Sequence, residues 1–168
     1  MYKWWKDLGL VQDLKLTRNQ PLIRYVGSMA SLANPTLSQQ RIDLTKTIAL
    51  IYIIDDVLIS TGPSMNLLFS QKPWDISVVE KLPYYVKSSF KALYDTTNEI
   101  ALRVYEKHGF NPIKSLRKLW ATLCDAFLVE AKWFASGHIP KSEELKNGLI
   151  TIGVQVLLVH MFFSTWGW

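Results

Sequence analysis

The spacing of apolar positions indicates helices along most of the chain. In the segment 21–32 the apolar residues recur at helical intervals, and Asn34-Pro35 ends the pattern. This first stripe consists of Leu22, Tyr25, Met29 and Leu32. A longer pattern begins at Ser38 and runs through SQQRIDLTKTIALIYIIDDVLI, where apolar residues occupy the whole circumference near Ile48. Such a helix is typical of the centre of a fold.

Helix start and stop signals divide the remaining chain. The segment STGPSMN predicts a loop after the central helix, and Asp75 can cap a short helix before Pro83. A long helix is expected from Tyr84 to His108, with Gly109 as its stop, and another from Asn111-Pro112 to Ser136-Gly137. The segment LITIGVQVLLVHMFF fits strand or helix by periodicity. Because no partner strand is apparent, we predict an all-α helical bundle.

The C-terminal segment raises the question of a membrane. Residues 149–168 contain no Lys, Arg, Asp or Glu over a length that would span a bilayer. The hydropathy of this segment is lowered by Gln155, His160, two threonines, one serine and two glycines. We therefore expect a buried core helix here in preference to a membrane span.

Composition fits one domain with a sizeable core. The chain has 168 residues, of which 49% are hydrophobic, and a formal net charge of +5. Its basic residues are scattered and form no dense run, which argues against nucleic acid as a partner. The single cysteine, Cys124, excludes an internal disulfide and sits in an apolar helical segment, so we expect a buried structural thiol. The start shows no targeting segment, and we expect a cytoplasmic or plastid location.

The adjacent Asp55 and Asp56 are the main candidates for chemistry. They follow a run of seven apolar or aromatic residues, and three more apolar residues come after them. Carboxylates facing an interior must be protonated, paired with a cation or bound to a metal. Magnesium is commonly held by one or two carboxylates together with substrate phosphates. A metal clamp on one helix face would need a second carboxylate at position 59, but this residue is Ile59. The alternative interpretation stays open, in which one aspartate pairs with an arginine and the other faces solvent.

The segment IYIIDDVLISTG resembles the aspartate-rich DDxxD motif of class I plant terpene synthases. Three further stretches resemble the same family in the same order: WWKDLGLVQDLKLTRNQPL, WDISVVEKLPYYVKSSFKALYDTTNEIALRVYEKHGFNP and LVEAKWFASGHIPKSEELKNG. The similarity covers the chain from about Tyr2 to Phe163 and is greatest to the linalool/nerolidol synthases. It implies a partial class I terpenoid synthase fold.

The resemblance also implies a chemistry. The family ionises an isoprenyl diphosphate, geranyl or farnesyl, with magnesium or manganese ions between carboxylates and diphosphate, and this branch forms a mainly acyclic alcohol such as linalool or nerolidol. Metal and arginine would stabilise the departing diphosphate, and apolar and aromatic walls would enclose the carbocation.

Individual residues can be matched to the family pattern. Asp55 and Asp56 match the two metal-binding aspartates, and Arg18 matches the first arginine of an element that contacts the diphosphate. Pocket-lining positions are expected to be Ile48, Ile51, Tyr52 and Gly27, together with Thr151 and Gly153 at a break in a pocket helix. For the apolar positions, ordinary core packing is an equal interpretation.

Several departures from the family pattern affect the expected activity. Ile59 replaces the third aspartate, Gly27 stands where a tryptophan is usual, and no Asp or Glu follows Glu144. We therefore interpret residues 1–168 as a single partial catalytic domain that lacks its C-terminal half, with impaired activity. The alternative is an inactive helical remnant that binds a partner or a membrane. In either case self-association is expected through apolar surface at Trp120, Phe127 and 149–163.

Overall fold

The computed structural model describes residues 2–9, 21–71, 74 and 82–165, and every regular element in these ranges is helical. The all-α prediction is therefore confirmed. The helices are α1 (Tyr2–Asp7), α2 (Pro21–Ser31), α3 (Ser38–Gln71), α5 (Tyr84–His108), α6 (Ile113–Ser136), α7 (Leu145–Thr151) and α8 (Val154–Thr165), with 3-10 turns η1 (Pro35–Leu37) and η2 (Ser142–Glu144).

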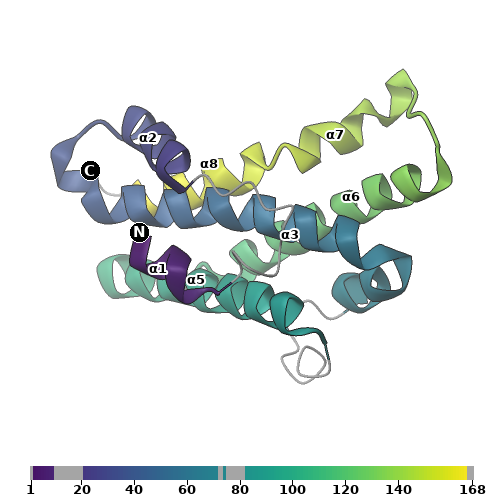
Figure 1. Ribbon diagram of the computed structural model, residues 1–168. Helices are drawn as coiled ribbons and strands as arrows, with labels where there is room; N and C mark the ends of the chain where they lie inside the picture. Colours follow the sequence, from purple (N-terminus) through teal and green to yellow (C-terminus); the bar gives the residue numbers. More distant parts are fainter. Residues whose placement is uncertain (1, 10–20, 72–73, 75–81, 166–168) are drawn as a thin grey trace.

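Helix α3 is the centre of the bundle and packs against α2, α5, α6 and α8 (Figure 1). Its segment 49–58 supplies a run of fully buried apolar residues, including Leu50, Ile54 and Leu58. These meet Trp120 and Phe127 of α6 in the main core cluster. Each buried side chain of this size contributes about 1.5–3 kcal/mol of hydrophobic stabilisation. The prediction of a central helix, made from the apolar residues around its whole circumference near Ile48, is therefore confirmed.

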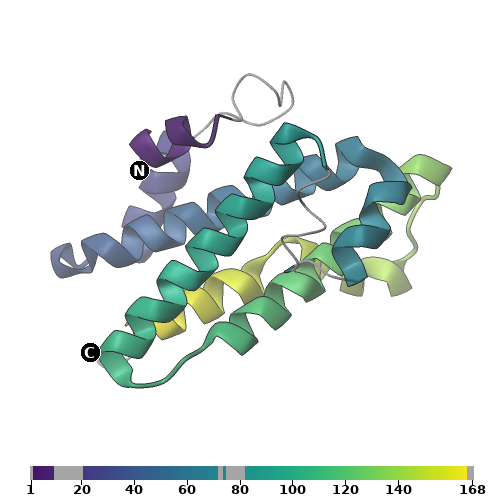
Figure 2. The ribbon, with the colours of Figure 1, turned by 90° about the horizontal axis from the view of Figure 1, so that it is seen from below.

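The predicted loop STGPSMN is wrong, because α3 continues through this segment to Gln71. Proline in a helix interior removes one backbone hydrogen bond and bends the helix without necessarily ending it. The path of α3 turns near its C-terminal end (Figures 1 and 2). The predicted short helix at Asp75 lies outside the described residues.

The predicted boundaries of α5 and α6 are confirmed. Both helices end in a glycine with left-handed backbone, Gly109 at φ 68° and Gly137 at φ 66°. At the start of α6, the Asn111 side chain accepts a hydrogen bond of 3.0 Å from the Ile113 amide. These local signals set the helix ends independently of tertiary packing.

Helix α2 packs differently from its apolar stripe. Among the α2 side chains that the structure describes, Arg24 and Ser28 are buried and Met29 is 48% exposed, and Leu32, directly after the helix, is buried as well. The Thr45 hydroxyl of α3 donates to the Ser28 hydroxyl at 2.9 Å, so hydrogen bonding replaces apolar contact in the middle of this interface. The expected apolar face of α2 is therefore only partly correct.

The C-terminal segment is not the buried core helix that the sequence predicts. It forms two helices, α7 and α8, which are separated at Ile152-Gly153, and on α8 only Val156 and His160 are buried. Leu145–Thr165 has the length and composition of a membrane-crossing helix, but no more than 17% of its apolar window is buried. Trp120 and Phe127, expected on exposed surface, are buried. The exposed apolar residues of this segment lie on α7, on α8 and at the junction between them: Leu145, Leu149, Ile152, Val154, Leu158 and Phe162.

Two buried titratable side chains serve the core. Cys124 is fully buried on α6, and burial raises the pKa of its thiol to about 12, which confirms a structural thiol. His160 on α8 donates from Nδ1 to the Val156 carbonyl at 2.7 Å and contacts Trp120 edge-on. Burial lowers the pKa of His160 to about 4, so its ring is neutral near pH 7.

Candidate functional site

A cavity of about 240 Å³ lies between α3, α6 and the junction of α7 with α8. Its lining contains five of the residues predicted for the site, and it adds three that were not predicted to line a pocket. The predicted residues are Ile48, Ile51, Tyr52, Asp55 and Thr151, and the added ones are Phe127, Ile152 and Leu157. Asp55 is thus the acidic residue of an otherwise mainly apolar lining, among the residues that the structure describes.

Helical periodicity brings the α3 residues of this cavity together. Ile48, Ile51 or Tyr52, and Asp55 are three or four positions apart and therefore share one face. Asp55 is half-buried and lies at the end of this stripe, while Asp56 is rotated by about 100° and is not part of the lining. Ile59, at the next position of the Asp55 face, is 46% exposed and offers no oxygen ligand.

The junction of α7 and α8 fits closely against α3. Gly153 has φ 74°, and a Cβ atom there would lie 2.8 Å from Cδ1 of Ile51. The Thr151 hydroxyl donates to Glu130 of α6 at 2.7 Å, which fixes the end of α7 beside the cavity. The sequence predicted a break at Thr151–Gly153, and the structure places a break there. Glu130 was missed because its contact joins residues 21 positions apart.

Arg24 of α2 contacts the ring of Tyr52, a residue of the cavity lining, but does not itself line the cavity. Its guanidinium carbon is 4.8 Å from the centroid of the Tyr52 ring and 5.3 Å from the centroid of the Trp5 ring. Arg24 is 7% exposed. Sequence reasoning missed it, although a basic residue inside an apolar helical stripe was a usable signal.

Two other predicted site residues are not brought to this cavity. Arg18 lies outside the described residues. Gly27 is exposed on α2, a Cβ atom there would meet nothing within 4 Å, and it lines no described cavity. The roles assigned to Arg18, Asp55, Asp56 and the pocket residues stay predictions.

The carboxylates available for a metal are few. Within the described part of the chain, no group of three or more His, Cys, Asp or Glu side chains could hold a metal ion. Asp55 and Asp56 would therefore supply at most two carboxylate ligands, from adjacent positions of the helix. That donor set fits magnesium that is bound mainly by substrate phosphates and water, and does not fit an all-protein cage.

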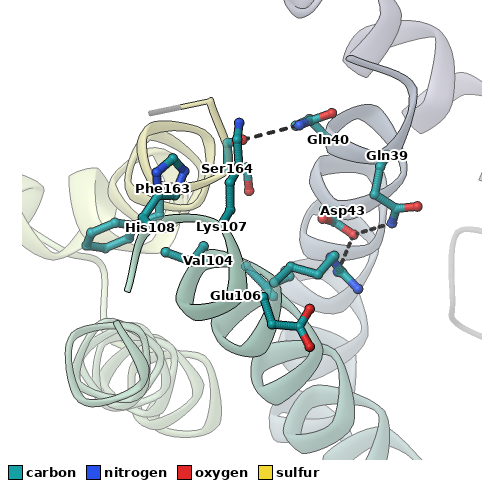
Figure 3. Close-up of a pocket in the computed structure, with 11 residues that line it drawn as sticks. Gln39, Gln40, Asp43, Val104, Glu106, Lys107, His108, Phe163 and Ser164 are labelled. Carbon is teal, nitrogen blue, oxygen red and sulfur yellow. Dashed lines mark hydrogen bonds and ion pairs between the residues drawn. The ribbon is translucent and has the colours of Figure 1, made fainter. Parts of the chain in front are cut away.

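A second cavity, of about 360 Å³, lies between the start of α3 and the ends of α5 and α8 (Figure 3). Asp43 accepts hydrogen bonds there from Gln39 at 3.0 Å and from Arg103 at 2.6 Å. Burial raises the pKa of Asp43, and Arg103 opposes this rise. Asp43 is 12 positions before Asp55, about 18 Å along the helix. The Asp43–Arg103 pair joins α3 to α5, and we assign it a structural role.

Comparison with known proteins agrees with the fold. The family described as "Terpene synthase family, metal binding domain" matches residues 6–166. The chain is 57% identical to a probable terpene synthase of Ricinus communis over 95% of its own length and 29% of that protein. It is 49% identical to an (E)-nerolidol synthase of Cannabis sativa, with 95% of the chain and 30% of the relative covered. For an S-(+)-linalool synthase of Arabidopsis thaliana the identity is 45%, with coverages of 96% and 29%.

Solved structures show the same arrangement of helices. Isoprene synthase from grey poplar, in complex with three Mg²⁺ ions and dimethylallyl-S-thiolodiphosphate, superposes with a TM-score of 0.88 at 30% identity. The match covers 97% of this chain and 32% of that one. The chain spans about 30% of the length of the curated relatives above. On the match over residues 6–166, the chain belongs to the terpene synthase family and represents part of its metal-binding domain.

Proposed function

We propose that this chain is part of a class I terpene synthase that ionises geranyl or farnesyl diphosphate to an acyclic alcohol such as linalool or nerolidol. The observation that carries the proposal is the Asp55 cavity, in which one carboxylate ends a wall of apolar α3 residues. The identities to nerolidol and linalool synthases support the acyclic product. We also propose a cytoplasmic or plastid location.

The polar residues would act on the diphosphate. Asp55 and Asp56 would hold magnesium or manganese, and Arg18 would contact the diphosphate. When bound, the metal would neutralise negative charge that develops on the leaving group. Asp55 lies at one end of the apolar stripe, so a metal held there would place the anionic end of the ligand at that end.

The apolar residues would bind the hydrocarbon. Ile48, Ile51 and Leu157 provide aliphatic walls, and Phe127 provides an aromatic face. Excluding water here delays capture of the carbocation. At about 240 Å³ the cavity is smaller than the usual 300–1,000 Å³ of ligand pockets, so the described residues enclose only part of the proposed pocket.

Binding of a non-ionising substrate analogue tests this function. We expect the purified chain to bind geranyl or farnesyl thiolodiphosphate weakly in calorimetry, with a requirement for magnesium, and Asp55→Asn to abolish that binding. Asp125→Asn is the matched control, because Asp125 is an exposed carboxylate on α6 outside the cavity lining. Binding that is independent of magnesium, or equal in Asp55→Asn, would contradict the proposal.

The alternative, an inactive remnant that binds a partner or a membrane, has one observation in its favour. The apolar residues of α7 and α8 are largely exposed, and surfaces of this kind mark association sites. Vesicle flotation of the chain, together with the analogue titration, separates the two functions. Flotation without analogue binding would favour the alternative.

A further inference from the structure

The cavity at the start of α3 contains a buried carboxylate of which the structure uses one oxygen. Asp43 is 4% exposed, and its Oδ1 atom accepts the hydrogen bonds from Gln39 and Arg103. No described residue donates a hydrogen bond to the other oxygen, Oδ2. In Figure 3 this second oxygen points away from Gln39, towards the side of the cavity where Val104 and Ser164 lie. The structural pair with Arg103 therefore leaves one acceptor of Asp43 available to a ligand.

A second acceptor without a partner lies one helical turn earlier on α3. Gln40 and Asp43 are three positions apart, and Oε1 of Gln40 is buried without a hydrogen-bond partner among the described residues. Its Nε2 atom donates to the Ser164 carbonyl at 3.4 Å, which is long for a hydrogen bond. Buried acceptors in this condition cost free energy, which a ligand that donates to them would recover. The same lining contains one buried donor without a partner, Nε of Arg103, so an uncharged amide is the competing ligand.

The charges around Asp43 favour a cation over an uncharged donor. Burial raises the pKa of Asp43 although Arg103 and Lys46 act in the opposite direction, so these cations compensate the carboxylate only in part. At the rim of the cavity, Glu106 and Lys107 are exposed and opposite in charge. A further positive group beside Oδ2 would therefore stabilise the carboxylate.

Apolar residues beside Asp43 provide a surface for the rest of a ligand. Ile100 and Val104 of α5 are buried in the lining, and Phe163 of α8 lies across from them. The volume of about 360 Å³ is within the range of roughly 300–1,000 Å³ that is usual for ligand pockets. The cavity thus combines an acidic end with an apolar wall.

We propose that this cavity binds a small protonated primary amine, whose ammonium group donates to Oδ2 of Asp43 and whose apolar body lies against Val104 and Phe163. An ammonium group has three donors and no acceptor, which suits the two acceptors of Gln40 and Asp43. The site lies about 18 Å along α3 from Asp55. The inference therefore goes beyond the proposed function and does not depend on it.

Titration of the chain with phenethylammonium tests this site. We expect saturable binding in calorimetry, and about tenfold weaker binding of phenylacetamide, an uncharged amide of similar size. Gln40→Lys places an ammonium group of the chain itself within reach of Asp43, so it should weaken binding of the added amine by about tenfold or more. Gln155→Lys is the matched control, because Gln155 is exposed on α8 about 13 Å along the helix from Ser164, and it should change binding less than about twofold.

Two further measurements locate the amine. Gln40→Lys should melt at the same temperature as the unmodified chain or higher in circular dichroism, because its ammonium group takes the place of the ligand beside Asp43. Asp55→Asn should leave amine binding unchanged, since the amine does not occupy the cavity at Asp55.

Several outcomes would overturn the inference. These are no saturable binding by the unmodified chain up to about 10 mM amine, or binding of phenylacetamide as tight as that of the amine. A Gln40→Lys variant that binds as tightly as the unmodified chain, or that melts at a lower temperature, would also overturn it. Equal losses in Gln40→Lys and Gln155→Lys, or loss of amine binding in Asp55→Asn, would do so as well.

Discussion

Replacing Gly153 by alanine would test the fit between α3 and the junction of α7 with α8. The residue has φ 74°, and the new methyl group would lie 2.8 Å from Cδ1 and 3.2 Å from Cγ2 of Ile51. The left-handed backbone costs alanine about 1–2 kcal/mol. Cδ1 can swing away, but Cγ2 is fixed by the stiff χ1 of a β-branched residue in a helix, which adds about 1–3 kcal/mol of overpacking.

The sum is a loss of about 2–5 kcal/mol in the free energy of unfolding, or roughly 10 °C in Tm for a chain of this size. Urea unfolding followed by circular dichroism at low protein concentration would measure it. Gly137→Ala is the control, since Gly137 has φ 66° and no atom within 4 Å of its Cβ position. This control bears the backbone cost alone, about 1–2 kcal/mol.

A second variant assigns the excess cost to Ile51. In an Ile51→Ala background both Cδ1 and Cγ2 are absent, so Gly153→Ala should bear the backbone cost alone and cost about 1–3 kcal/mol less than in the unmodified chain. If Gly153→Ala and Gly137→Ala cost the same, the close contact with Ile51 is not what positions the junction, and the steric argument is refuted.

Three further predictions concern pH, metal binding and association. The pKa of His160 is lowered to about 4 from 6.5, so its contribution is complete above pH 6.5 and is lost as the pH falls towards 4. Urea titrations should show a loss of about 2–3 kcal/mol between pH 7 and pH 4.5 that His160→Gln lacks, and parallel curves for both would count against this. Ile59→Asp returns a carboxylate to the Asp55 face and should strengthen magnesium binding in calorimetry without restoring catalysis. Metal-dependent linalool or nerolidol, detected by mass spectrometry from geranyl or farnesyl diphosphate, would refute the second part. Light scattering should show self-association that Leu158→Glu reduces, because Leu158 is 58% exposed on α8, and a monomeric unmodified chain would refute it.

The features that the sequence predicted correctly depend on local signals. Gly109 and Gly137 end their helices through backbone geometry that glycine adopts without strain. The α3 wall of the cavity follows from helical periodicity, which places Ile48, Ile51, Tyr52 and Asp55 together whatever packs against them.

The missed features depend on distant partners. Pro63 was expected in a loop, yet the central helix continues through it, so a local breaking signal did not decide the outcome. The contacts of Arg24 are with aromatic rings on two other helices, so they could not be predicted from its own segment. The contact between Glu130 and Thr151 likewise requires α6 and α7 to be in place. Contacts between residues far apart in the chain produce no periodic pattern in a single sequence.

The burial of Cys124 provides a reporter of core opening. The reactive form of a thiol is the thiolate, and here its formation is suppressed by a pKa of about 12 and by complete enclosure within the core. An alkylating reagent should therefore modify the chain only when α6 separates from its neighbours, and the labelling rate reports how often this happens. Since the sequence has no other cysteine, a spectroscopic label could be attached to a cysteine introduced on the surface while Cys124 is left in place.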